Sequence, residues 1–227
     1  VEQIVFSSTC ATYGEPAQLP LHESHPQNPV NPYGESKLFV EKAMRWYGAA
    51  YGLRWIALRY FNAAGADVDA EIGEVHDPEP HLIPLVLQAA RGERPEVSIL
   101  GTDYATPDGT AIRDYIHVDD LAQAHILAMH HLAGGGESGA FNLGSGRGYS
   151  VREVIAAVEK HAGCKVPVVE KGRRPGDPHS LVAGAERAAE VLGWRPAHGL
   201  DSIVATAWAW ECIKHKQRSS ALQNEGS

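Results

Sequence analysis

The chain has 227 residues, and 20 Lys and Arg against 28 Asp and Glu give it a formal net charge of −8 at pH 7. With 44% apolar and 21% charged residues it can bury a sizeable core, which excludes a disordered chain. The acidic balance and the lack of a bilayer-length apolar run argue against nucleic-acid and membrane partners, so we expect a cytoplasmic protein.

The first 65 residues alternate between strand and helix patterns. A short buried strand is predicted over residues 2–8, and a loop rich in Pro, His, Gln and Asn follows from Glu15 to Pro32. A helix is predicted from Tyr33 to Tyr51, ending at Gly52, and a second strand from Arg54 to Phe61. This order is typical of an α/β unit with a parallel sheet.

An acidic, irregular segment over residues 66–80 separates this unit from a second set of elements, and we place a domain change near Gly65. The first elements expected beyond it are a helix over 82–91, a strand over 96–100, a loop over 102–110 and a strand over 113–117. A helix capped by Asp119 or Asp120 should then run to Leu132, followed by a strand over 140–143. A further helix should begin after the capping box Ser150 to Glu153, and a last helix should cover 200–214. Residues 217–227 are expected to be a disordered tail. We interpret Asp119 and Asp120, the carboxylates near His117, as capping groups and predict no metal site.

Tyr33 and Lys37 stand four residues apart at the start of the first predicted helix. This spacing puts the phenol and the ammonium on one helix face, so we predict that Lys37 lowers the pKa of Tyr33 and makes it a usable base. The hydroxyl-rich turn that ends with Thr9 follows a strand, where α/β sheets present ligand-binding groups. A hydroxyl, a Tyr and a Lys together are what proton removal from a substrate alcohol requires.

In this order the pattern resembles the short-chain dehydrogenase/reductase superfamily, and longer strings narrow the resemblance. The strings are FSSTCATYGEP (6–16), NPYGESK (31–37), RYFN (59–62), HLIP (81–84), GTDY (101–104), DGTAIRDYIHV (108–118), FNLG (141–144) and RRPGD (173–177). This ordered set is similar to the UDP-glucose 4-epimerase family and covers nearly the whole chain. The resemblance implies an α/β fold: the C-terminal part of a Rossmann-like doubly wound parallel sheet and a smaller α/β substrate-binding domain.

The resemblance also implies NAD as cofactor, a UDP-sugar as substrate and a role for each matching residue. Tyr33 would take the proton of the sugar 4-hydroxyl, Lys37 would tune it and hold the nicotinamide ribose, and Thr9 would hydrogen-bond the 4-oxygen. Phe61 would lie near the nicotinamide. The residues implied in UDP-sugar binding, besides Thr9, are Asn62, His81, Leu82, Ser98, Leu100, Arg113, Arg174, Asp177 and Leu181, the last at the gate of the sugar pocket.

The implied reaction interconverts UDP-glucose and UDP-galactose by C4 oxidation, rotation of the 4-keto sugar and re-reduction. Three alternatives stay open: a UDP-arabinose (UDP-xylose) 4-epimerase, a UDP-N-acetylglucosamine 4-epimerase favoured by the small Leu181, and a non-catalytic nucleotide-sugar-binding module. A dehydratase is disfavoured because Thr9 is followed by Cys and Ala rather than by two carboxylates.

The resemblance divides the chain into residues 1–65 of the NAD-binding domain and residues 66–216 of a UDP-sugar domain, with 113–132 returning to the first. The glycine-rich NAD turn that begins this family is not in the sequence, so we expect the chain to be part of a longer protein, inactive by itself. For the intact protein we expect a homodimer.

Overall fold

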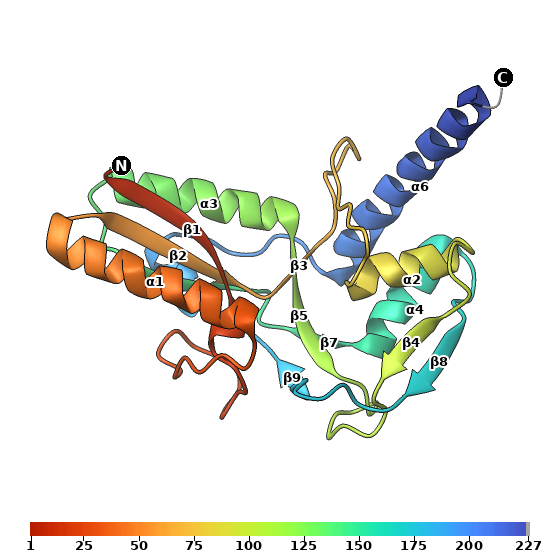
Figure 1. Cartoon of the computed structure of the whole chain (residues 1–227), viewed down its shortest axis with the longest axis horizontal. Coiled ribbons are helices and arrows are strands. Elements are labelled where there is room, and N and C mark those ends of the chain that lie inside the picture. The colour runs from red at the N-terminus through yellow and green to blue at the C-terminus, as the bar shows by residue number, and fades with distance from the viewer. Residues whose placement is uncertain (226–227) are drawn as a thin grey trace.

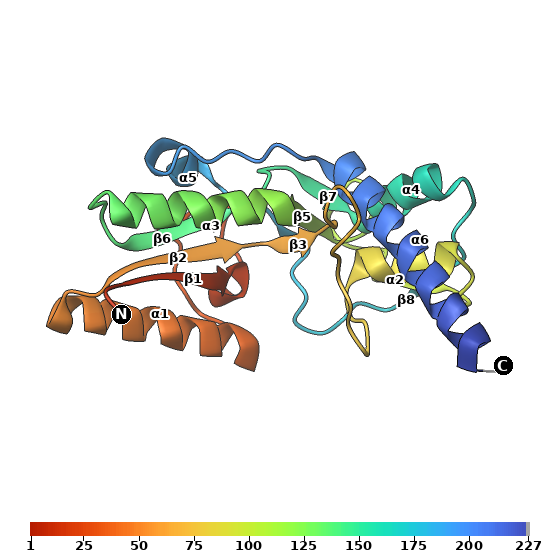
Figure 2. The same cartoon turned by 90° about the horizontal axis from the view of Figure 1, so that it is seen from above.

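A computed structural model gives the structure of the chain. It describes residues 1–225, with the side chains of residues 1–214. Three parallel strands form the first sheet in the order β1 (Gln3–Thr9), β2 (Arg54–Tyr60) and β6 (Gly139–Leu143). The helices α1 (Pro32–Tyr51) and α3 (Val118–Ala133) cover its opposite faces, as Figure 2 shows. The predicted α/β class with a parallel sheet is confirmed.

Alternate residues of β2 fill two separate cores, one under each helix. Ile56 and Leu58 are fully buried against α3, whereas Trp55 and Ala57 pack against α1. Successive side chains of a strand point to opposite faces, so a sheet that carries helices on both faces needs an apolar residue at every position. The apolar run WIAL in β2 supplies these residues.

The elements that follow β2, apart from α3 and β6, form smaller sheets covered by helices (Figure 1). β5 (Ile112–His117) pairs with β3 (Asn62–Ala64), β7 (Gly148–Ser150) and β9 (Ser180–Leu181), and β4 (Val97–Leu100) pairs with β8 (Val168–Lys171). The helices are α2 (Leu82–Ala90), α4 (Val151–Ala162), α5 (Glu186–Val191) and α6 (Leu200–Glu225), besides a 3₁₀ turn, η1 (Cys10–Thr12). Residues of α2, α4, α6, β4 and β5 share one apolar core.

The ends of α1 and α4 follow from local sequence. Asn31 caps α1, its side chain accepting from the Gly34 N–H, and Gly52 ends it at φ 72°, a conformation that glycine adopts without strain. The predicted capping box of α4 is present, with Ser150 and Glu153 bonded to each other's backbone.

The structure corrects three predictions of secondary structure. His117, not Asp119 or Asp120, caps α3, because the Asp120 carboxylate instead accepts from the backbone of Ala197 and His198. The last helix continues past residue 214 to 225, because no Gly or Pro interrupts it. The tail that was expected to be disordered is therefore helical over 217–225. Residues 226 and 227 of that tail lie outside the described residues.

The short elements β7, β8, β9 and α5 were not expected from the sequence. The division into domains near Gly65 stays a prediction, although α3 does pack against β1 and β2. Along the described part of the chain, no helix combines the length and the apolar character needed to cross a membrane.

Candidate active site

A cavity of about 540 Å³ lies where β1 and β2 end, between the first sheet and the N-terminus of α2. Six of the residues predicted for the site line it: Thr9, Tyr33, Phe61, Asn62, His81 and Leu82. Cys10, Tyr115, Trp210 and Glu211 complete parts of the wall. Polar groups at the carboxyl ends of parallel strands are the usual ligand contacts of α/β sheets, so this cavity is the candidate active site.

The first turn of α1 brings Tyr33 to the cavity wall beside Thr9. The turn packs directly on η1: a Cβ at Gly34 would stand 2.4 Å from the carbonyl oxygen of Ala11, so only glycine allows this approach. Thr9 ends β1, and its hydroxyl accepts from the Ala11 N–H at 3.2 Å. The Thr9 hydroxyl and the Tyr33 phenol therefore meet on one side of the cavity.

Lys37 lies one turn further along α1, and its ammonium is directed to the sheet. Its Nζ donates to the Ser7 carbonyl at 3.0 Å and lies 5.7 Å from the centroid of the Tyr33 ring. Burial raises the pKa of Tyr33 above its usual value, and interaction with the Thr9 hydroxyl pulls it down only in part. The predicted lowering of the Tyr33 pKa is therefore wrong for the described structure, in which burial outweighs the effects that lower it.

A buried polar network holds α1 to the first sheet, next to the Thr9 and Tyr33 side of the cavity. Both oxygens of Glu41 accept from Arg59, Oε1 from Nε at 2.9 Å and Oε2 from Nη2 at 2.5 Å, and Ser8 donates to Oε1 at 2.5 Å. Arg59 Nη1 donates to the Tyr13 hydroxyl at 3.0 Å, which in turn donates to Asn142 at 2.6 Å. Burial works to raise the pKa of Glu41, but the bonds and charge of Arg59 outweigh it and hold that pKa below its usual range.

This network was not predicted from the sequence. A usable signal was present, since Glu41 follows Lys37 by four residues and so shares the helix face of the predicted site residues. Arg59 is likewise a charged residue inside an otherwise apolar strand. A charge at such a position needs a partner, and the partner's identity depends on the register of the fold.

The opposite wall of the cavity comes from the loop before α2. His81 is the N-cap residue of α2 without a side-chain cap bond, and its Nδ1 lies 2.8 Å from Glu74 Oε1 and 2.9 Å from Glu79 Oε1. His76 Nε2 lies 3.0 Å from the same oxygen of Glu74. These carboxylates were not predicted as site residues, since the segment was interpreted only as irregular and acidic.

The remaining predicted residues lie outside this cavity. Arg113 in β5 forms an ion pair with Asp177, and Leu181 of β9, opposite Arg113 in register, packs against the cluster that contains Phe61. Ser98 and Leu100 lie in β4.

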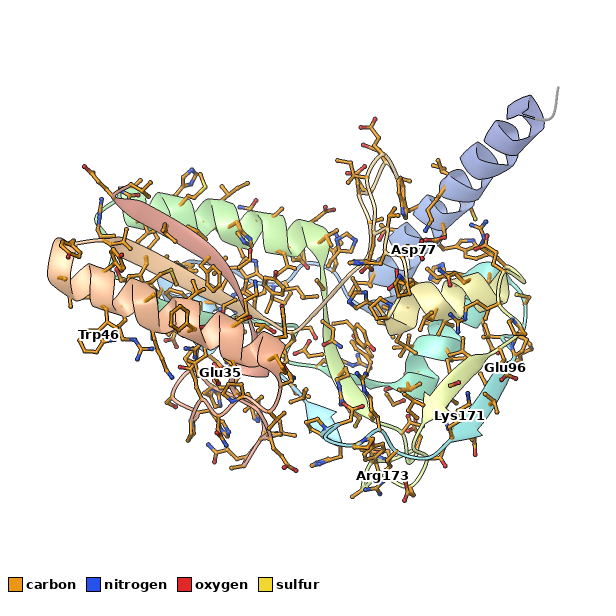
Figure 3. The ribbon with its side chains drawn as sticks, in the orientation of Figure 1. Glu35, Trp46, Asp77, Glu96, Lys171 and Arg173 are labelled. Carbon is orange, nitrogen blue, oxygen red and sulfur yellow. The ribbon has the colours of Figure 1, made fainter. Side chains whose placement is uncertain are left out.

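Asp177 and Arg174 line a second hollow of about 390 Å³, together with Arg173 and Tyr104. The Arg173 guanidinium lies 4.4 Å from the ring centroid of Tyr104 and also pairs with Asp103. Figure 3 shows Arg173 beyond the end of β8, past Lys171.

Comparison with known proteins identifies the relatives of this chain. The model of the NAD dependent epimerase/dehydratase family matches residues 1–144. The chain belongs to this family. A UDP-glucose 4-epimerase of Halalkalibacterium halodurans is 54% identical over 226 residues, which are 99% of this chain and 66% of that protein. The predicted resemblance to UDP-glucose 4-epimerases is confirmed.

Solved structures of this family agree with the fold. A UDP-glucose 4-epimerase from Brucella ovis in complex with NAD is 52% identical, with a TM-score of 0.89 over 92% of this chain and 64% of that one. One from Bifidobacterium longum in complex with NAD⁺ and UDP is 43% identical, with a TM-score of 0.87 over 94% of this chain and 64% of that one. The fold is therefore Rossmann-like, and the chain spans about two thirds of the length of these relatives.

Proposed function

We propose that the complete protein is an NAD-dependent UDP-glucose 4-epimerase, an isomerase that interconverts UDP-glucose and UDP-galactose. The observation that carries this proposal is the meeting of Thr9 and Tyr33 in one cavity, with Lys37 one helical turn away. The names of the relatives at about half identity support it, as do related structures with NAD and UDP bound.

The donors around Lys37 fit the ribose of a nicotinamide cofactor. An ammonium has three N–H donors, and one is directed to the Ser7 carbonyl, which leaves two for the hydroxyls of a ribose. The half-exposed Tyr33 phenol lies on the same helix face. NAD, when bound, supplies the acceptor for the C4 hydride and returns it to the other face of the sugar.

The proton chemistry falls to Tyr33 and Thr9. The Thr9 hydroxyl holds the 4-oxygen of the sugar, and Tyr33 takes the proton of the 4-hydroxyl and later gives it back to the reduced product. Because burial holds the Tyr33 pKa above its usual value, the phenol needs positive charge close by to lose its own proton. Lys37 carries such a charge, 5.7 Å from the ring centroid.

We propose that the UDP part binds to residues between His81 and Asp177. His81 and the α2 N-terminus present a donor and a positive dipole end to the cavity, which suits a diphosphate. Arg113 pairs with Asp177, and Arg174 and Asp177 line the second hollow. Their guanidinium groups can hold anionic oxygens in an otherwise acidic protein.

The test is an epimerase assay on the complete protein, in which UDP-galactose is converted and the UDP-glucose formed is oxidised by a coupling dehydrogenase. Tyr33→Phe removes the proton-transfer group and should lower kcat by roughly 10²- to 10⁴-fold. Tyr51→Phe, at the exposed end of α1, is the matched control and should keep the wild-type rate. A wild-type rate in Tyr33→Phe would contradict the mechanism, and UDP binding by an inactive wild-type protein would favour the binding-module alternative.

We also propose that the protein is a homodimer through the outer face of α1. Five aromatic side chains are exposed on this helix, and the three between its ends are Phe39 at 70%, Trp46 at 75% and Tyr47 at 58%. Figure 3 shows Trp46 directed away from the sheet. Such a cluster marks an interaction surface. Light scattering should give twice the chain mass for the wild type and the single mass for Trp46→Glu. An unchanged dimer in that variant would contradict an interface on this face of α1.

We place the protein in the cytoplasm, as expected from its sequence. Its three cysteines, Cys10, Cys164 and Cys212, are free thiols in the structure, as expected in a reducing compartment. Fractionation of the source cells with an antibody to the chain tests this location.

A further inference from the structure

The loop between β3 and α2 gathers two imidazoles and two carboxylates within eight residues. Glu74 Oε1 lies 3.0 Å from His76 Nε2 and 2.8 Å from His81 Nδ1, and Glu79 Oε1 lies 2.9 Å from the same Nδ1. The ligand atoms of Glu74, His76 and His81 are all within 4.8 Å of one another. Three groups that can ligate a metal therefore converge on one point of the cavity wall, and Glu79 lies beside one of them, His81.

The carboxylates of this cluster face imidazoles rather than fixed cations. Glu74 and Glu79 both approach Nδ1 of His81, and Glu79 also accepts from the His81 N–H at 2.9 Å. Among the residues with described side chains, the ion pairs of both carboxylates are with histidines, whereas the nearby Lys214 and Arg91 pair with Glu211. With neutral imidazoles the cluster carries two negative charges, which a divalent cation would balance.

The backbone of the loop is anchored, whereas the side chains of its two histidines have room to adjust. The Trp210 indole donates to the Glu74 carbonyl at 3.1 Å, and Gly73 lies so close to that indole that a Cβ would meet it at 2.3 Å. The His76 and His81 side chains are about half exposed. Tetrahedral zinc with bonds of about 2.0–2.1 Å separates its ligand atoms by roughly 3.3–3.4 Å, so small side-chain rotations from the observed 2.8–3.0 Å suffice.

The donor set selects the kind of metal. Imidazole nitrogens with carboxylate oxygens suit zinc, whereas calcium and magnesium take oxygen ligands almost alone. We propose that Glu74, His76 and His81 form a three-ligand Zn²⁺ site in the wall of the cavity, with Glu79 next to the ring of His81. Zinc in this site holds the ring of His81, so it competes with a nucleotide diphosphate for that ring; this second part rests on the proposed function.

The binding test titrates Zn²⁺ into the metal-free complete protein in the presence of a chromophoric chelator. The wild type should withdraw one zinc ion per chain from the chelator. Glu74→Gln keeps the shape of the side chain but loses the anionic ligand, and His76→Ala removes an exposed imidazole; each should weaken binding at least about tenfold. Circular dichroism confirms that the variants fold.

The control comes from the other cluster of this kind in the described residues, formed by His117, Asp119 and His198. His198→Asn should bind zinc as the wild type does. Wild-type affinity in Glu74→Gln and His76→Ala, or a loss of binding confined to His198→Asn, would overturn the proposal.

A separate measurement tests the competition with nucleotide. Saturating Zn²⁺ should weaken UDP binding to the wild type at least about tenfold in calorimetry and should leave UDP binding to His76→Ala unchanged. Zinc binding without any effect on UDP refutes the competition and leaves the site standing. A protein that binds zinc but never UDP refutes the proposed function instead, and the chelator titration still decides the metal site.

Discussion

Replacement of Glu41 by Gln tests whether the buried network under the site holds α1 in place. The substitution keeps the shape of the side chain but removes the charge opposite Arg59, which is 3% exposed. Loss of one partner of a buried ion pair costs about 3–5 kcal/mol, because the other charge is left uncompensated. A loss of about 4 kcal/mol, at an m-value of about 2 kcal/mol/M, moves the urea midpoint down by about 2 M.

Urea unfolding followed by tryptophan fluorescence measures this loss, and Trp55, buried between β2 and α1, reports on the affected contact. Glu35→Gln makes the same chemical change on the exposed first turn of α1, where a carboxylate contributes at most about 1 kcal/mol. The double variant Glu41→Gln/Arg59→Met should recover part of the loss, since no buried charge remains. Equal midpoints for Glu41→Gln and Glu35→Gln would refute the role given to the network.

The same substitution has a pH signature of definite sign. The pKa of Glu41 lies lower in the folded state than its usual value of 4.5. Its stabilising effect is therefore fully present above pH 4.5 and is lost as the pH falls through the folded-state pKa. The difference in unfolding free energy between wild type and Glu41→Gln should be constant near neutral pH and shrink below pH 4.5. A difference that grows on acidification would contradict this assignment.

Three further substitutions test other contacts. Gly34→Ala puts a Cβ 2.4 Å from the Ala11 carbonyl, so α1 must move off η1, and kcat should fall at least about tenfold while far-UV dichroism is unchanged; full activity would contradict the close packing. Ser150→Ala removes the cap of α4 and should cost about 1–2 kcal/mol in urea unfolding, with Ser36→Ala as the exposed control. Leu181 should permit turnover of UDP-N-acetylglucosamine that Leu181→Tyr abolishes, and no turnover by the wild type at high enzyme concentration would refute this role.

The sequence predicted the long elements of the fold well, and physical reasons separate these from the elements it missed. α1 and α4 have caps and C-terminal glycines that are written in neighbouring residues. The strand β9, in contrast, has two residues and exists only because it pairs with β5, some seventy residues earlier. No local pattern encodes such a pairing. The cap of α3 was predicted wrongly for a similar reason. The Asp120 carboxylate accepts from the backbone of Ala197 in a distant loop, and His117 caps the helix.

The candidate site also has parts that local sequence predicted and parts that depend on distant contacts. The motif around Tyr33 identified the residues that line the cavity from the first sheet, because motif and helix start coincide in sequence. The Glu41–Arg59 pair depends on the register that places Ser8 opposite Arg59, which the sequence does not state. The cluster at Glu74 depends on how an irregular loop folds back on α6. In both cases the contacts of the polar groups are set by the folded structure and cannot be read from the neighbouring sequence.

The pKa of Tyr33 shows why spacing on a helix is an incomplete guide to electrostatics. The i, i+4 rule places Lys37 and Tyr33 on one face but leaves the long lysine side chain free to choose its acceptor. In the structure that acceptor is the Ser7 carbonyl in β1, and burial is the largest effect on the Tyr33 pKa, which is raised. An occupant that bonds to the ammonium on the Tyr33 side would bring the charge nearer the phenol and lower this pKa. We therefore expect a ligand that contacts both side chains to lower the Tyr33 pKa, which burial raises.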